Sequence, residues 1–301
     1  MQTPPDVRSD DGIRSEDDVK SSSLWRRFRK HKVAMIGGFI LTALVLMAVF
    51  APYVAPNDPY DQRLDLSYGG PSWEHPLGLD RIGRCNLSRL IFASRISLSV
   101  GVISAGVSMT IGVFLGSIAG YYGGTTDHVL SRIADAMLSL PAIVIIMTLV
   151  FVLGTHILNI MVVIGLLGWV GIFRLVRGQI LSLREREFYL AAIASGAPPT
   201  RIMAKHLIPN SLSPVIVAVT LRTAASILTE STLSFLGFGI QPPLASWGST
   251  LSAAQSLTIL TLYPFLWVPP GIAIAVTVLS INFVGDGLRD ALDPRAQLRV
   301  K

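Results

Sequence analysis

The sequence predicts an all-α membrane protein with six transmembrane helices, a cytoplasmic elbow between the fourth and fifth helices, and a long outer segment after the first. Hydrophobic residues make up 51% of the 301 residues, whereas charged residues make up only 15%. Soluble domains usually carry about 25% charged residues. The mean hydropathy is +0.56, and separate apolar runs reach the roughly 20 residues that a membrane-spanning helix needs.

The expected helices follow these apolar runs, which polar or Gly- and Pro-rich breaks separate. The candidate spans are residues 33–54, 97–121, 136–153, 158–178, 212–235 and 265–285. Turn residues in GFGIQPPLASWG (Gly237 to Gly248) divide the last two runs, and a partly inserted segment at 251–264 stays open. The expected organisation is given by three ranges: a disordered cytoplasmic tail at 1–23, the first helix and outer segment at 24–95, and a transmembrane domain at 96–301.

The distribution of Lys and Arg predicts that both termini are cytoplasmic. The cluster RRFRKHK precedes the first apolar run, and that run is too long for a signal-peptide core, so an uncleaved span is expected. Further basic residues follow the fourth span and the last span. The basic residues expected outside lie in one long loop and are Arg63, Arg81, Arg84, Arg89 and Arg95. A multi-pass membrane protein fits this pattern.

Several function classes lack their characteristic motifs. The single cysteine, Cys85, excludes an internal disulfide and a cysteine-based metal cluster. The histidines have no ligand spacing, and the sequence has neither a phosphate-binding G-x-x-x-x-G-K-[ST] loop nor an H-E-x-x-H motif. We therefore expect no catalytic residues, no metal site and no cofactor in this chain. The net charge of +6 is explained by basic residues on the inner side of the membrane, so it does not indicate nucleic-acid binding.

The second span has a small residue at every fourth position. The stripe consists of Ser104, Ser108, Gly112, Gly116 and Gly120. This spacing lines one helix face and lets another backbone approach closely. It predicts helix packing inside a bundle.

Two ionisable residues, Arg222 and Glu230, fall inside the fifth span. Charges at membrane depth usually face a bundle interior or a water-filled path, so both are candidates for the path or an outer gate. Because Glu230 is close to the outer end of the span, solvation at the interface remains an alternative.

Between the fourth and fifth spans, residues 184–210 predict a helix–turn–helix elbow on the cytoplasmic face. The first helix, 184–195, should end at Gly196, since glycine tolerates a left-handed helix stop. Pro198 and Pro199 suit the first turn of a second short helix, which Pro209 should end. A small-residue surface at Ala191 and Ala192 would fit a partner protein, although an amphipathic hairpin on the inner leaflet is an alternative.

This elbow resembles the EAA–x3–G–x9–I–x–L–P loop of ATP-binding-cassette importer permeases. Ala191, Ala192, Gly196 and Pro209 match the motif in register. Three positions depart from it, with residues Leu190, His206 and Ile208. The stretches HPLGLDRIGRCNLSRLIFASRISLSVG, GYYGGTTDHVLSRIADAMLSLPAI, SFLGFGIQPPLASWGSTL and GDGLRDALDPR resemble the C-type permease of dipeptide and oligopeptide importers. Leu79 and Cys85 depart from that pattern, and the resemblance covers nearly the whole chain after residue 24.

The resemblance implies a permease subunit in the inner membrane of a prokaryote that moves short peptides into the cytoplasm. A second, homologous permease would complete the path, two ATP-binding subunits or domains would bind ATP and Mg and grip the elbow, and an extracytoplasmic peptide-binding protein would deliver the substrate. The outer segment, with Trp73 and Asp80, would lie at the outer gate. The same permease type also serves nickel, opine or glutathione uptake, and a secondary transporter is an alternative of another class.

Overall fold

The computed structural model describes residue 26 and residues 28–292, and the regular elements among them are helices. In chain order these are α2 (Lys32–Val49), α3 (Ala51–Val54), η1 (Leu64–Leu66), α4 (Asn86–Tyr122), α5 (Gly124–Ser139), α6 (Ala142–Leu153), α7 (Ile157–Leu183), α8 (Glu187–Ala194), α9 (Pro199–Ile202), η2 (Met203–Leu207), α10 (Ile208–Phe235), α11 (Trp247–Leu251), η3 (Ser252–Gln255), α12 (Leu257–Leu262) and α13 (Pro264–Leu292). The predicted tail at 1–23 lies outside the described residues. The predicted all-α membrane class is confirmed.

Five helical stretches of the described chain are long and apolar enough to cross a membrane. They are α2, α4, α7, the continuous helix from Pro199 to Phe235, and α13. A sixth span exists only where α5 and α6 together count as one, because the pair is bent by 90°. The predicted span at 136–153 is therefore wrong as a single helix, because this stretch contains the break between α5 and α6.

The bend between α5 and α6 is caused by Pro141. Leu140 has extended backbone angles, φ −104° and ψ 144°, and Pro141 is the N-cap of α6. Proline disfavours helical angles at the preceding residue and has no N–H to donate. The apolar run therefore continues across Pro141, although the helix is interrupted there.

Helix α4 begins earlier than its apolar run. The run starts near residue 97, but the helix starts at Asn86 and its first turns bury Ser88, Arg89 and Ser94. These polar side chains pack against protein rather than lipid, so hydropathy alone does not detect this part of the helix. The expected outer segment therefore ends in helix.

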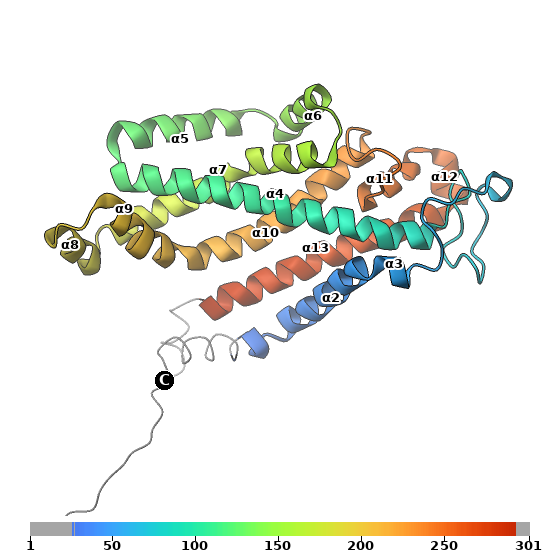
Figure 1. Ribbon diagram of the computed structural model, residues 1–301, viewed down its shortest axis with the longest axis horizontal. Helices are drawn as coiled ribbons and strands as arrows, with labels where there is room; N and C mark the ends of the chain where they lie inside the picture. Colours follow the sequence, from blue (N-terminus) through green and yellow to red (C-terminus); the bar gives the residue numbers. More distant parts are fainter. Residues whose placement is uncertain (1–25, 27, 293–301) are drawn as a thin grey trace, which may run out of the picture.

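The long helices run side by side between two ends of the molecule (Figure 1). One end carries α8 and α9, and the other carries the outer segment with α11 and α12. Helix α4 packs along α7, α10 contacts both, and α13 connects α10 to α2. The bundle therefore places the elbow and the outer segment at opposite ends.

The small residues of α4 lie against α7. The hydroxyl groups of Ser104 and Ser108 each donate a 2.8 Å hydrogen bond, to the carbonyl oxygens of Met161 and Gly165. A Cβ placed on Gly116 would lie 2.8 Å from the Phe173 carbonyl oxygen. Larger side chains would separate the two helices.

Helix α5 is joined to α7 by two ion pairs. Arg174 Nη2 lies 2.6 Å from Asp135 Oδ1, and Arg177 forms a two-pronged pair with Asp127. Both arginines lie near the C-terminal end of the predicted span 158–178. In the structure they hold α5 against the bundle, together with a hydrophobic cluster in which Ala134 of α5 packs with Trp169 and Phe173 of α7.

We predict that Gly116→Leu lowers the melting temperature of the purified chain in detergent, because the added side chain forces α4 away from α7. Overpacking of this kind typically costs about 1–3 kcal/mol. Gly106→Leu is the matched control on the same helix, since a Cβ there meets no atom within 4 Å. Equal melting temperatures for the two variants would contradict the close-packing role of Gly116.

Candidate functional site

Helix α8 ends in a glycine-dependent turn. Gly196 has a φ of +73°, and a Cβ there would meet no atom within 4 Å. The Gly196 N–H donates to the Ile193 carbonyl at 2.9 Å, and the Ala197 N–H donates to the Ala192 carbonyl at 3.2 Å. These two bonds form a Schellman motif. Glycine is thus required for the backbone angle rather than for space.

The second half of the elbow is not a separate helix. Helix α9 continues through the π-helix η2 directly into α10, where Pro209 stands in the first turn. The prediction that Pro209 ends this helix is therefore wrong. The Ile208 N–H bonds to the Met203 carbonyl, five residues back. We attribute the wider π turn to Pro209, which supplies no N–H and whose ring would crowd the preceding turn.

Buried side chains anchor the elbow to the ends of the long helices. Tyr189 of α8, Ile202 of α9 and Leu207 of η2 join one hydrophobic cluster with Ile180 of α7. Arg184 Nη1 also donates to the Gly120 carbonyl at 3.0 Å, which ties the start of the elbow to the end of α4. The elbow is therefore a fixed extension of the bundle.

The outward side of the elbow carries a hollow of about 380 Å³. Its lining residues are Phe188, Ala191, Ala192, Ser195, Ala197, Arg201, Lys205 and His206. The structure thus brings Ala191, Ala192 and His206 together, whereas Leu190, Gly196, Ile208 and Pro209 do not line the hollow. Sequence reasoning missed Phe188, Arg201 and Lys205. The i, i+3 spacing of Phe188 and Ala191 and the i, i+4 spacing of Arg201 and Lys205 are the signals that could have revealed them.

The elbow also exposes apolar side chains. Phe188, Leu190 and Ile193 are all exposed on α8, around the two alanines. Clustered apolar exposure of this kind marks a surface that contacts a protein or a membrane. With the basic residues Arg201 and Lys205 beside it, the hollow presents small apolar walls and a positive rim.

The two ionisable residues of α10 are engaged inside the bundle. Arg222 Nη2 donates to the Ile164 carbonyl at 3.1 Å, and its Nε has no hydrogen-bond partner. Glu230 is 0% exposed, which contradicts solvation at the interface. Its Oε1 accepts a 2.6 Å bond from Ser234, and the Ser234 hydroxyl also accepts the Ile240 N–H at 3.2 Å. Ser234 thus connects Glu230 to the loop that follows α10.

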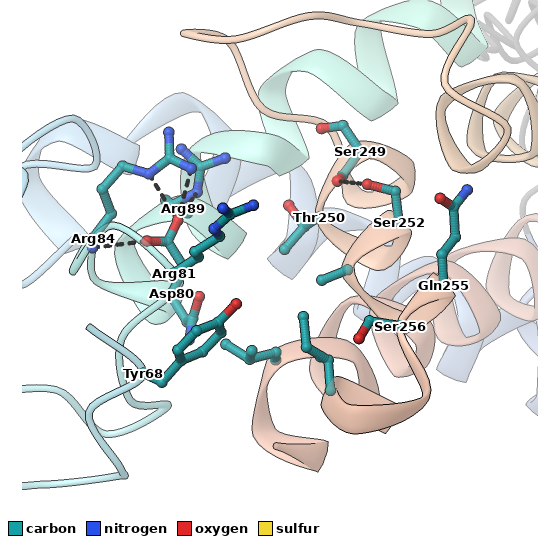
Figure 2. A pocket seen from close by; sticks show the side chains of 14 residues that line it. Tyr68, Asp80, Arg81, Arg84, Arg89, Ser249, Thr250, Ser252, Gln255 and Ser256 are labelled. Carbon is teal, nitrogen blue, oxygen red and sulfur yellow. Dashed lines mark hydrogen bonds and ion pairs between the residues drawn. The ribbon is translucent and has the colours of Figure 1, made fainter. Parts of the chain in front are cut away.

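At the opposite end, a cavity of about 440 Å³ lies between the outer segment and the α11–α12 region (Figure 2). Asp80 and Arg81 line it from the outer segment, and Ser249 and Thr250 of α11 line it from the facing wall. Trp73 is fully exposed and lies outside the lining. Of the two outer-segment candidates, the structure therefore places Asp80 in a cavity and Trp73 on the surface.

Asp80 organises its side of this cavity. Its Oδ1 accepts the backbone N–H groups of Ile82 and Arg84, both at 3.0 Å. Its Oδ2 accepts Arg84 Nε at 2.7 Å and lies 3.7 Å from Arg89 Nε. The carboxylate is thus fully used in holding the turn and two guanidinium groups in place.

The chain matches two family models. Residues 112–298 match the binding-protein-dependent transport system inner membrane component, and residues 22–71 match the N-terminal transmembrane domain of oligopeptide transport permease C. These matches agree with the resemblance carried by the elbow and the outer segment.

Curated proteins are similar over almost the full chain. The oligopeptide transport system permease protein OppC of Bacillus subtilis is 41% identical over 92% of this chain and 91% of its own. The dipeptide transport system permease protein DppC of the same organism is 41% identical over 94% and 90%. The glutathione transport system permease protein GsiD of Pectobacterium atrosepticum is 38% identical over 90% of each chain. The chain therefore belongs to the family of inner-membrane components of binding-protein-dependent transport systems.

Proposed function

We propose that this chain is the C-type permease subunit of an ATP-driven importer that moves short peptides into the cytoplasm. The observation that carries the proposal is the full-length similarity to the oligopeptide and dipeptide permeases, combined with an anchored elbow that has an apolar, hollowed outer side. The similarity to a glutathione permease favours glutathione as the second candidate substrate.

In this mechanism the chain supplies the path and partner subunits supply the energy. The elbow at 184–210 lies in the cytoplasm and docks into an ATPase subunit, and two such ATPases bind ATP and Mg. A second, homologous permease completes the path, and an extracytoplasmic binding protein delivers the peptide to the outer end. Both termini are cytoplasmic. Closure of the ATPases moves the elbow and changes which side of the membrane the path faces.

The elbow is suited to this role because one side is anchored in the bundle and the other side exposes apolar residues. Tyr189 and Leu207 are buried in the bundle. A displacement of α8 would therefore be transmitted to α7 and α10. The exposed Phe188, Leu190 and Ile193 would be covered by the ATPase. Burial of apolar area contributes about 25 cal/mol per Å², so covering this face would favour docking.

We predict that Gly196→Asp uncouples ATP hydrolysis from uptake. The charge would be buried unpaired in the contact with the ATPase, at a cost on the order of 3 kcal/mol of docking free energy. Gly196→Ala is the matched control, because it shares the left-handed backbone strain of about 1 kcal/mol without the charge. The measurement is ATPase co-purification and peptide-stimulated ATP hydrolysis. Full coupling in the aspartate variant would show that Gly196 is not at the contact.

We predict that deleting this gene abolishes uptake of labelled di- to pentapeptides by whole cells and that the intact gene restores it. Uptake of labelled glutathione, nickel and an opine is measured in the same strains. Unchanged peptide uptake with lost uptake of one of the other solutes would replace the peptide assignment and retain the permease assignment.

A further inference from the structure

The outer cavity has an excess of positive charge. Three arginines line it, Arg81, Arg84 and Arg89, against one acid, Asp80. Asp80 already pairs with Arg84 and lies near Arg89. Among the described residues no carboxylate lies within ion-pair distance of Arg81. Figure 2 shows the Arg81 side chain extending across the cavity toward Thr250.

Arg89 supplies a second, independent sign of a missing anion. Its side chain is only 8% exposed, yet its Nη1 atom is buried without a hydrogen-bond partner. A buried guanidinium donor with no acceptor is costly, and an anion that accepts its N–H groups removes that cost. Planar guanidinium groups bind carboxylates in particular, because their paired N–H donors match the two carboxylate oxygens.

The facing wall offers the opposite chemistry. The hydroxyl groups of Thr250 and Ser252 donate to backbone carbonyls at 2.9 and 2.7 Å. With their hydrogens used, these groups offer acceptor oxygens, which suit a ligand's N–H groups. Ile259 and Leu266 add apolar surface. The volume of about 440 Å³ falls in the range of about 300–1,000 Å³ that small-molecule sites occupy.

We propose that this cavity binds the C-terminal end of the incoming peptide, with its carboxylate held by Arg81 and Arg89 and its last N–H groups facing Thr250 and Ser252. The inference rests on the proposed peptide-import function. It assigns to the outer end of this chain a subsite that recognises a group shared by peptides of every sequence.

The test compares a labelled tripeptide as the free acid with its C-terminal amide. Their binding to the assembled permease–ATPase complex in lipid nanodiscs, without the delivering protein, is measured by ligand-observed NMR, which detects weak affinities. We expect the free acid to bind about tenfold more tightly than the amide, as a charge-assisted hydrogen bond allows. Arg81→Gln should remove that preference. Arg63→Gln, on an exposed arginine of the same segment outside the cavity, should retain it.

Equal binding of acid and amide to the unmodified complex, or no detectable binding of the acid, overturns the proposal. A second arm measures docking of the peptide-free delivering protein. If Arg81→Gln weakens that docking while the preference for the acid persists, the arginine receives an acidic side chain of that protein instead, which also overturns the proposal. The proposed function fails separately, when cells carrying the intact gene take up no peptide.

Discussion

The close approach of α4 and α7 is the constraint on which the rest of the fold depends. Lipid is as apolar as leucine, so helices in a membrane associate through tight packing and hydrogen bonds rather than hydrophobic burial. Here serine hydroxyls of α4 reach carbonyls of α7, and Gly165 of α7 in turn admits Val107 of α4, whose Cβ would lie 2.6 Å from a Cβ on the glycine. Because α7 leads into the elbow and the first turns of α4 carry Arg89, the register of this pair positions both the elbow and the outer cavity.

The features that the sequence predicted well are those with a local cause. Apolar runs mark the long helices, and Gly196 with the two prolines that come after Ala197 marks the turn, because left-handed angles and proline geometry are properties of single residues. The failures occur where two local signals compete. At Pro141 the helix is interrupted although the apolar run continues. At Pro209 the helix continues past its expected end, because a π turn accommodates the proline. The polar first turns of α4 were missed because their burial depends on distant segments.

The outer cavity could not be predicted as a site, since its two walls are far apart in the chain. Asp80 was recognised only as part of a family motif, and the arginines beside it counted merely as outer charges. The partners on α11 belong to a charge-free stretch whose serines and threonines look like ordinary turn residues. For Glu230 the sequence indicated a position near the outer end of a span but not that the side chain is buried. Its burial depends on a loop that folds back over the end of α10, as shown by the bond between Ser234 and the Ile240 N–H.

A continuous helix connects the two ends of the molecule. From Pro199 the chain runs through η2 and α10 to Phe235 without leaving helical geometry, so the second half of the elbow and the Glu230–Ser234 contact lie on one continuous helix. The Ser246 hydroxyl lies 3.4 Å from that of Ser234 and caps α11, the helix that carries Thr250 of the outer cavity. Packed and hydrogen-bonded groups therefore join the second half of the elbow to the outer cavity.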